Sequence, residues 1–220
     1  MIIDCIADMH GFYPKLEGGD LLIIAGDITA SDTVPQLKEF FDWFQAQKYR
    51  KKVLVGGNHD NFLSHSLSTY EGLRMGLIEH YNENDYEYLL DSGTEFEGLK
   101  IWGSPWTPWF SGVHPKCKAF MLSEKELEKK WKLIPENTDI LITHGPPYAC
   151  LDQNMDGEFC GSKSLDKRLS KVYLKYHVFG HIHEAYGQSY GPMNSQHLSI
   201  NCSHVNFHYK PVNKPVRIEL

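Results

Sequence analysis

Three short stretches near the N-terminus decide the fold: MIIDCIADMH at residues 1–10, DLLIIAGD at residues 20–27 and KKVLVGGNHD at residues 51–60. Each contains a short apolar run that is followed, after Ala or Gly, by Asp or Asn. Runs of this length are typical of buried strands and are too short for helices. The sequence therefore predicts strands over Ile2–Ala7, Leu21–Ala25 and Lys52–Val55.

A helix is predicted between the second and third of these strands, over Val34–Lys48. Its apolar residues recur at helical spacing. They are Leu37, Phe40, Phe41 and Phe44. The alternation of strands with a helix favours an α/β sheet.

The rest of the chain adds short strands and one further helix. The helix is predicted over Ser123–Ile134, with Ser123 as the N-cap and Glu126 completing a capping box. The predicted strands are Tyr86–Leu90, Thr94–Phe96, Leu99–Trp102, Asp139–Thr143, His177–Phe179, Leu198–Asn201 and Val216–Leu220. Neither an internal repeat nor a linker is evident, so residues 1–220 are expected to form a single domain.

The composition is that of a soluble globular protein. The chain has 220 residues, of which 41% are hydrophobic and 23% charged, and no apolar run is long enough to span a membrane. With 22 Lys and Arg against 28 Asp and Glu, the net charge is −6, which argues against binding to a nucleic-acid backbone. The five cysteines form no Cys-x-x-Cys pair and no signal peptide is evident, so a cytoplasmic location is expected.

Histidine, carboxylate and amide side chains follow five of the predicted strands, at the point where each strand ends. They are Asp8 and His10, Asp27, Asn58, His144, and His181 and His183. In α/β sheets, ligands bind beyond the carboxyl ends of the strands, so these side chains are expected to meet at one site. Residues two apart on an extended chain point the same way, which lets Asp8 and His10 face one point.

This set of donor atoms indicates metal ions. Seven oxygen and nitrogen donors exceed the four ligands of a tetrahedral site, and they suit two ions roughly 3.5–4 Å apart that share a carboxylate. Mixed oxygen and nitrogen ligation without thiolate suits Mn, Fe or Zn. Two such ions bind phosphate oxygens and supply hydroxide near neutral pH, so the ligand chemistry indicates hydrolysis of a phosphate ester.

The strand-end motifs follow one another in a set order between residues 8 and 183. They are Asp8-x-His10, Gly26-Asp27, Gly57-Asn58-His59-Asp60, His144-Gly145 and Gly180-His181-x-His183. This ordered set resembles the calcineurin-like metallophosphoesterases. KIWGSPWTPWF at residues 100–110 and THGPP at residues 143–147 resemble the metallophosphoesterase-domain-containing subgroup, whose studied members include phosphodiesterases of cyclic nucleotides. The resemblance implies an α/β fold, a four-layer αββα sandwich of two mixed β-sheets flanked by helices.

The resemblance also implies which residues bind metal. Asp8, His10, Asp27 and His183 would hold one ion, and Asp27, Asn58, His144 and His181 would hold the second, with Asp27 as the bridge. Some animal members of the subgroup have glycine where this chain has His181, so a complete second site is expected here. The expected cofactors are two divalent metal ions, Mn²⁺ in vitro, with Fe or Zn as alternatives.

Catalytic and substrate-binding residues follow from the same resemblance. His59 would contact phosphate together with Asn58 and donate a proton to the leaving oxygen, while Asp60 would orient the His59 ring. A carboxylate beside an imidazole favours its protonated form, which an acid role requires. Among the tryptophans of residues 100–110, Trp106 is the one expected to face the substrate. The alternative for these tryptophans is that they pack in the core or in a lid.

The leading hypothesis is a dinuclear metal-dependent phosphoesterase in which a metal-bound hydroxide attacks a small phosphodiester, such as a cyclic nucleotide. A phosphomonoesterase or nucleotide phosphatase is the alternative enzyme, and a non-catalytic metal-binding scaffold is the rival class. The expected partner is a small-molecule phosphate ester, with no nucleic-acid or membrane partner. The sequence does not determine the oligomeric state.

Seven of the twelve histidines fall outside these motifs. Single histidines are most often solvated or packed in a core with their hydrogen bonds satisfied, and that is the expectation for these seven. They are His65, His80, His114, His177, His197, His204 and His208.

Overall fold

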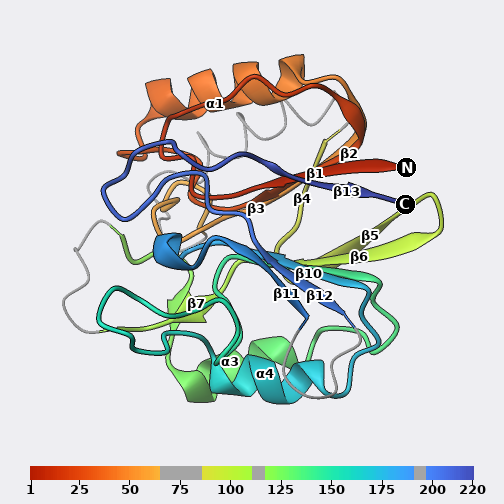
Figure 1. Cartoon of the computed structure of the whole chain (residues 1–220), viewed down its shortest axis with the longest axis vertical. Helices are drawn as coiled ribbons and strands as arrows, with labels where there is room; N and C mark the ends of the chain where they lie inside the picture. Colours follow the sequence, from red (N-terminus) through yellow and green to blue (C-terminus); the bar gives the residue numbers. More distant parts are fainter. Residues whose placement is uncertain (65–85, 111–116, 191–196) are drawn as a thin grey trace.

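Two β-sheets pack face to face in the computed structural model, which describes residues 1–64, 86–110, 117–190 and 197–220 (Figure 1). The first sheet contains β1 (Ile2–Ile6), β2 (Gly19–Ala25), β3 (Tyr49–Val55), β4 (Tyr86–Tyr88) and β13 (Val216–Glu219). The second contains β5 (Ser92–Phe96), β6 (Leu99–Ser104), β9 (Ile140–Thr143), β10 (Tyr176–Phe179), β11 (Gly187–Tyr190) and β12 (Leu198–Asn201). A short pair, β7 (Thr107–Pro108) and β8 (Met121–Leu122), lies outside both sheets.

Both sheets are mixed, as predicted. The first has the order β13-β1-β2-β3-β4, in which β1 to β4 run parallel and β13 runs antiparallel to β1. The second has the order β11-β12-β10-β9-β6-β5, in which the four central strands run parallel and the two edge strands antiparallel. Within each sheet, the parallel strands therefore deliver the loops at their carboxyl ends to one edge.

Helices cover the outer face of each sheet (Figure 1). They are α1 (Val34–Ala46) on the first sheet, and α3 (Glu124–Trp131) and α4 (Lys163–Leu169) on the second. Phe40 and Phe44 of α1 are buried in one cluster with Leu22 of β2, because the apolar stripe of the helix faces the sheet. Trp131 of α3 and Leu165 of α4 are buried together against the second sheet. Among the described residues, no helix is long and apolar enough to cross a membrane.

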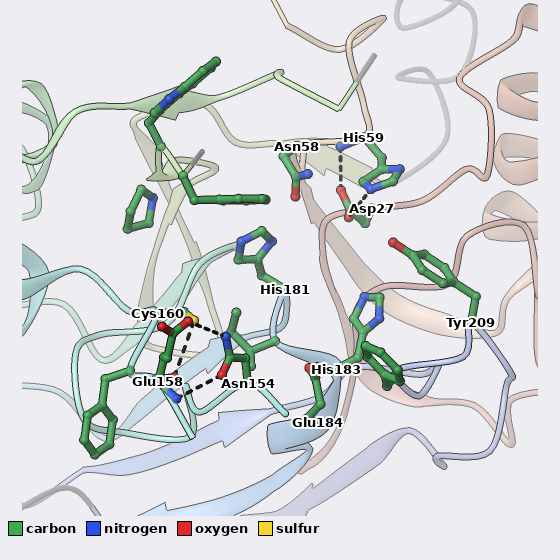
Figure 2. A pocket seen from close by; sticks show the side chains of 16 residues that line it. Asp27, Asn58, His59, Asn154, Glu158, Cys160, His181, His183, Glu184 and Tyr209 are labelled. Atoms are coloured by element: carbon green, nitrogen blue, oxygen red, sulfur yellow. Dashed lines mark hydrogen bonds and ion pairs between the residues drawn. The ribbon is translucent and has the colours of Figure 1, made fainter. Parts of the chain in front are cut away.

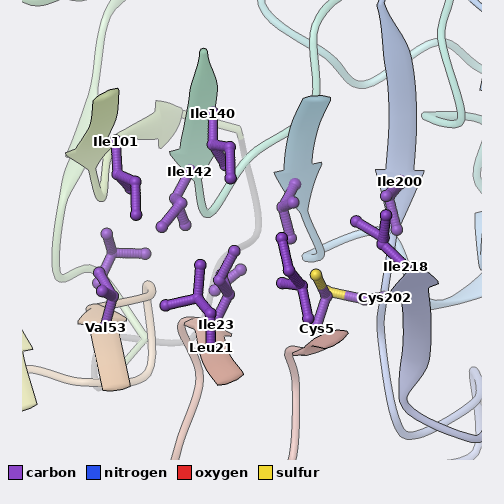
Figure 3. Close-up of a cluster of buried hydrophobic side chains, with 14 of the residues drawn as sticks. Cys5, Leu21, Ile23, Val53, Ile101, Ile140, Ile142, Ile200, Cys202 and Ile218 are labelled. Atoms are coloured by element: carbon purple, nitrogen blue, oxygen red, sulfur yellow. The ribbon is translucent and has the colours of Figure 1, made fainter. Parts of the chain in front are cut away.

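A layer of branched apolar side chains fills the space between the sheets (Figure 3). It includes Leu21, Ile23 and Val53 from the first sheet and Ile101, Ile140 and Ile142 from the second. Burial of one such side chain contributes about 1.5–3 kcal/mol to stability. Together with the two outer helical clusters, this layer completes the predicted order of helix, sheet, sheet and helix, so the four-layer fold is confirmed.

The predicted elements are confirmed with small shifts at their ends. The first helix begins at Val34, with the side chain of Thr33 as its N-cap, and the second has the predicted capping box of Ser123 and Glu126. The sequence analysis missed α4, β11 and the two-residue strands β7 and β8. The signal for α4 was present, because Ser162 caps it and its Leu165 and Leu169 lie one turn apart on the buried face.

The histidines outside the motifs are packed in the core or exposed to solvent where the structure describes them, as expected, except that Nδ1 of the buried His177 has no hydrogen-bond partner among the described residues. His177, His197 and His204 are buried, and His208 is exposed. The other three, His65, His80 and His114, lie outside the described residues. His177 Nε2 lies 2.9 Å from Thr143 Oγ1, which itself donates to the carbonyl oxygen of Gly145 and therefore accepts from the imidazole.

Acid is expected to destabilise the metal-free protein in part through His177. Burial holds the pKa of this imidazole well below its ordinary value of 6.5, so below pH 6.5 the unfolded chain binds a proton that the folded chain does not. Stability is then lost as the pH falls, by up to about 1.4 kcal/mol per pH unit for one group. His177→Gln keeps a donor but cannot titrate. Urea unfolding between pH 7.5 and 5 with a chelator should show a shallower loss for the variant, and equal slopes would contradict this assignment.

Candidate metal centre

The strand-end residues named by the sequence meet at one place between the two sheets. Asp8 and His10 follow β1, Asp27 follows β2, Asn58 follows β3, His144 follows β9, and His181 and His183 follow β10. Backbone hydrogen bonds join these loops: Asp8 donates to the carbonyl of Gly26 at 3.0 Å, and Gly180 donates to that of His144 at 3.0 Å. Within each sheet, these loops are thus joined to one another.

Several of these residues have backbone conformations that side-chain-bearing residues seldom adopt. The φ angles are 50° at Asp8, 43° at His10, 53° at Asp27 and 70° at His181. Non-glycine residues in this left-handed region cluster at functional sites, where the surroundings hold the strained conformation. Each of these residues therefore turns sharply out of its strand and into the shared space.

Two glycines allow the carboxylates to approach the neighbouring loops closely. A Cβ atom on Gly57 would lie 2.2 Å from Asp27 Oδ1, and one on Gly180 would lie 2.2 Å from Asp8 Oδ2. These distances are far shorter than any van der Waals contact, so both positions require glycine if the carboxylates stay in place. The glycines beside the strand-end donors are thus part of the geometry of the site.

The Asp27 carboxylate faces two different groups of imidazoles. Its Oδ2 lies 3.6 Å from His10 Nε2, and its Oδ1 lies 3.5 Å from His144 Nε2. Oδ1 also accepts a hydrogen bond of 2.9 Å from the backbone N–H of His59. A carboxylate placed in this way can bridge two metal ions, one on each side.

Three potential ligand atoms converge around His144. Nδ1 lies 2.9 Å from the carbonyl oxygen of Ala25, so it carries a proton and leaves Nε2 with a lone pair in the neutral ring. Nε2 is 2.9 Å from Asn58 Oδ1, and the Asn58 amide is oriented by its Nδ2, which donates to the carbonyl of Cys117 at 3.2 Å. Asp27 Oδ1 is also close to His144 Nε2, at 3.5 Å. These three potential ligand atoms, from His144, Asn58 and Asp27, are arranged so that a cation would fit between them.

One carboxylate oxygen of Asp8 is also available to bind a metal ion. Its Oδ2 accepts from the backbone N–H of His181 at 2.8 Å and from Ser203 Oγ at 2.6 Å. Its Oδ1 is fully buried and has no hydrogen-bond partner among the described residues. This oxygen lies 3.6 Å from His183 Nε2, which is itself 3.4 Å from His10 Nε2. A buried carboxylate oxygen left without a hydrogen bond, beside two imidazole nitrogens, is the second observation that fits a metal ion.

Three groups of ligand atoms lie close enough together to hold an ion. They are Asp8 with His10 and His183, His10 with Asp27 and His59, and Asp8 with Asp27 and His144. The ring nitrogens of His181 belong to none of these groups within the described chain, although its ring centroid is 5.0 Å from that of His144. The structure thus brings all seven predicted ligands together, with His181 beside His144 at the margin of the third group.

Burial decides the charge of two site histidines before any metal binds. It lowers the pKa of His10 to about 4 and that of His181 to about 3, so both rings are neutral near pH 7 and can act as ligands. Burial also opposes the charged form of His144, but the nearby Asp27 carboxylate outweighs it and raises the pKa to about 9. A metal ion that binds Nε2 of His144 must therefore displace a proton. For Asp8 burial acts upward, whereas the charge of the nearby His183 imidazole holds the pKa of the carboxyl group below its usual range.

Asp60 has a different position from the one expected. Its carboxylate does not face the His59 ring but accepts three backbone hydrogen bonds, from Asp27 at 2.8 Å, from Ile28 at 3.1 Å and from Gly57 at 2.7 Å. It therefore ties the loops after β2 and β3 together. The His59 ring is flanked instead by Cys117 Sγ, 3.6 Å from Nδ1, and by Asp27 Oδ2, 4.0 Å from Nε2.

The expectation for Trp106 also needs correction. Its Nε1 donates to the Asp91 carboxylate at 2.9 Å, Lys130 Nζ lies 4.2 Å from its ring centroid, and its ring packs edge-on against Phe120. It does not line the pocket above the strand ends. Trp109, which is 49% exposed, lines that pocket in its place. The two tryptophans flank the two-residue strand β7, and nothing in the sequence distinguished the partly buried ring from the exposed one.

A pocket of about 830 Å³ opens directly above the strand-end donors (Figure 2). His181 and His183 face Asp27, Asn58 and His59 across it. Exposed aromatic rings form much of its wall; they are Trp109, Phe110, Phe159, Phe207 and Tyr209. None of the described residues that line the pocket is Lys or Arg, whereas Glu158 and Glu184 are both present. Among the described lining residues, only imidazoles can therefore carry positive charge toward a phosphate.

The sequence analysis missed two residues of the C-terminal segment that contact the site. Ser203 follows β12 and donates to Asp8, so the rule that polar residues follow strand ends would have found it. Tyr209 packs against the rings of His10 and His183, with centroids 4.9 Å and 5.1 Å away. It lies in an irregular loop, and no periodicity or motif marks it.

A sheet edge lined by buried carboxylates, an amide and imidazoles defines a metallophosphoesterase centre. The chain belongs to the calcineurin-like phosphoesterase family, whose model matches residues 1–185. It is 34% identical over 238 residues to the human protein named Metallophosphoesterase domain-containing protein 1, with 98% of this chain and 70% of that protein aligned.

Solved structures share the fold at low sequence identity. One crystal structure superposes with a TM-score of 0.69 at 12% identity and covers 99% of this chain and 98% of its own. The crystal structure of the protein TT1561 of Thermus thermophilus superposes with a TM-score of 0.62 at 13% identity and covers 91% of this chain and 88% of its own. At these identities the likeness concerns the fold alone.

Proposed function

We propose that this metallophosphoesterase hydrolyses small phosphodiesters, cyclic nucleotides among them, with two divalent metal ions. The observation that carries the proposal is the convergence of buried ligand atoms from Asp8, Asp27 and His144, with Asp8 Oδ1 left without a hydrogen bond among the described residues. Two ions bound there would supply Lewis acidity and lower the pKa of water toward neutrality. Mn²⁺ is the ion proposed in vitro, with Fe or Zn as alternatives, because the donors are oxygen and nitrogen without thiolate.

The ligands divide between two sites that share Asp27. Asp8, His10, Asp27 and His183 would hold one ion, and Asp27, Asn58, His144 and His181 the other. The 3.6 Å and 3.5 Å distances from the two Asp27 oxygens to His10 and His144 support this division. The position of His181 beside His144 supports its place in the second site.

His59 is proposed as the proton donor to the leaving oxygen. Its ring lies between the Asp27 carboxylate and the thiol of Cys117, at the pocket wall. With Nδ1 directed at Cys117 Sγ, the Nε2 atom faces the metal ligands and is the nitrogen that can donate. Asn58 would contact the phosphate beside it, and Asp60 would hold the Asp27 and Gly57 loops in register.

The pocket chemistry favours a diester over a more highly charged ester. A diester has one negative charge, whereas a nucleoside polyphosphate carries several. Without Lys or Arg among the described lining residues, and with Glu158 and Glu184 present, the pocket offers only imidazoles as side-chain counter-charge for additional phosphates. Its aromatic wall suits a flat substituent such as a nucleobase or an aryl group. A phosphomonoesterase or nucleotide phosphatase is the alternative that this charge argument disfavours.

The rest of the proposal concerns the setting of the enzyme. We propose a single domain over residues 1–220 that acts in the cytoplasm on a small-molecule phosphate ester. A non-catalytic scaffold is the rival, and it is disfavoured because all seven ligand positions and His59 hold side chains of the required type.

Hydrolysis of bis-p-nitrophenyl phosphate and p-nitrophenyl phosphate tests the proposal. The protein is stripped of metal, reloaded with Mn²⁺ and compared with Asp27→Ala. We expect metal-dependent cleavage of the diester that exceeds cleavage of the monoester and disappears in the variant. A preference for the monoester would support the phosphatase alternative. Binding of two ions without turnover of any ester, cyclic nucleotides included, would support the scaffold.

Trp109 is expected to contribute to substrate affinity, whereas Trp106 is not. Trp109→Ala should raise KM for bis-p-nitrophenyl phosphate roughly 2- to 10-fold, the range for loss of one aromatic contact. Trp106→Phe is the matched control, because it removes the hydrogen bond to Asp91 outside the pocket. It should lower the melting temperature and leave KM unchanged. A larger rise in KM for Trp106→Phe than for Trp109→Ala would contradict the placement of the two rings.

A further inference from the structure

The three imidazoles nearest the two carboxylates are not held in the same way. His144 is oriented by Nδ1, which donates to the carbonyl oxygen of Ala25 at 2.9 Å. Among the described residues, neither His10 nor His183 has a hydrogen bond on Nδ1, since each makes its polar contacts through Nε2. Metal-binding histidines almost always gain their orientation from a partner on the second nitrogen. Something else must fix the rings of His10 and His183.

Tyr209 contacts both of these rings at once. Its ring meets His10 edge to face, with centroids 4.9 Å apart and an interplanar angle of 69°. It meets His183 in the same manner, at 5.1 Å and 88°. Figure 2 shows the Tyr209 ring beside His183. T-shaped contacts of this kind contribute about 0.5–1.5 kcal/mol each for aromatic pairs, and they restrict ring rotation.

A tight turn presents Tyr209 in this position. Tyr209 has a φ of 54°, in the left-handed region, and its N–H donates to the carbonyl of Asn206 at 2.8 Å. The Asn206 side chain organises the turn, because its Oδ1 accepts from the backbone N–H groups of His208 at 3.0 Å and Lys210 at 3.1 Å. A non-glycine residue held in this conformation by a dedicated side chain is typical of a functional loop.

The segment that carries this turn is anchored to the metal ligands themselves. His204 donates from its backbone N–H to the carbonyl of Ala7 at 2.8 Å, and Val205 donates to that of Asp8 at 3.3 Å. Ser203 Oγ donates to Asp8 Oδ2 in the same region. The segment from Ser203 to Tyr209 therefore fixes Asp8 at one end and covers His10 and His183 at the other. It lies beyond residues 1–185, which the family model matches.

We propose that Tyr209 is a positioning residue whose ring orients His10 and His183 and thereby sets the metal affinity of the site they form with Asp8. This inference rests on the proposed function for the presence of two metal sites. The His144 site is independent of Tyr209, because its ring has its own hydrogen bond to Ala25. The ring and not the hydroxyl is required, since both contacts are ring contacts.

Calorimetric titration of the metal-free full chain with Mn²⁺ tests the proposal without any activity assay. In Tyr209→Ala, one of the two sites should weaken roughly 10-fold or more, the range for loss of a group that orients a metal ligand. The other site should keep its affinity. Tyr209→Phe keeps the ring and should bind both ions as the unaltered chain does. Asn206→Ala, which loosens the turn without touching the site, should give an intermediate loss.

Phe207→Ala is the matched control. Phe207 is a similarly exposed ring of the same loop, and its ring contact is with His208 and not with the metal ligands. Its Mn²⁺ affinities should be unchanged. The melting temperature of each metal-free variant, compared with that of the unaltered chain, separates loss of a site from loss of the fold.

Three results would overturn the proposal. If Tyr209→Ala binds two Mn²⁺ ions with unchanged affinity, Tyr209 does not position the ligands. If Tyr209→Phe loses as much Mn²⁺ affinity as Tyr209→Ala, the effect belongs to the hydroxyl. If Phe207→Ala loses as much, the effect belongs to the loop as a whole. If the unaltered chain fails to bind two ions, the proposed function fails as well, so that failure is distinguishable from the failure of Tyr209 alone.

Discussion

Replacing Asp27 with Asn is expected to remove metal-dependent hydrolysis, with a fall in kcat/KM of roughly 10³-fold or more. The two carboxylate oxygens face His10 on one side and His144 on the other, at 3.6 Å and 3.5 Å. An amide of the same size places an N–H donor where one of these oxygens provides a lone pair, and it also removes a negative charge between two cations. The number of ions retained should fall from two to one or none.

Asp139→Asn is the matched control for this change. Asp139 is also an aspartate at a strand boundary, but its Oδ1 pairs with Lys175 at 2.9 Å and not with any of the site histidines. Activity and metal content should stay near those of the unaltered protein. Two retained ions and full activity in Asp27→Asn would contradict the bridging role, whatever the control shows.

Replacing His59 with Asn is expected to slow the reaction by an amount that depends on the leaving group. General acid catalysis contributes roughly 10²- to 10⁴-fold when the leaving oxygen is strongly basic, and little when it is a nitrophenolate. The expected loss is therefore large for a cyclic nucleotide, whose leaving group is a sugar alkoxide, and small for bis-p-nitrophenyl phosphate. A series of aryl esters should show a steeper dependence of rate on leaving-group pKa in the variant.

The series of leaving groups serves as the internal control. If His59 only bound the phosphate, every ester would lose the same factor and the slope of the plot would not change. Equal losses would thus remove the acid assignment and leave a binding role. Retention of two Mn²⁺ ions in the variant would show that the loss does not arise from His10 or Asp27, which lie next to the His59 ring.

The convergence of the candidate ligands could be predicted from the chain because each of them follows a buried strand within four residues. Asp8, Asp27 and Asn58 are placed by the ends of β1, β2 and β3, which run parallel in one sheet. The position of such a residue is fixed within one or two residues by the covalent chain and the strand register. Ser203 could have been predicted for the same reason, since it follows β12 by two residues.

Residues whose role depends on side-chain direction or on a long loop were harder to predict. Trp106 and Trp109 are three residues apart in one proline-containing stretch, yet one donates to Asp91 and the other lines the pocket. Asp60 lies next to His59 in the sequence, but its carboxylate is held by backbone N–H groups, two of which belong to the loop after β2. These partners are distant in the chain, so sequence proximity suggested the wrong contact.

The sequence by itself determined the alternation of strands and helices and the residue types that could bind metal, and the four-layer class was implied only by the resemblance to a known family. Apolar periodicity fixes which faces are buried, and strand ends fix where polar side chains leave the core. Only the tertiary structure decided which oxygen of Asp8 is left without a hydrogen bond among the described residues, which imidazole each oxygen of Asp27 faces, and that Tyr209 covers His10 and His183. Those contacts join segments up to about 200 residues apart in the chain, and they exist only once both sheets have packed together.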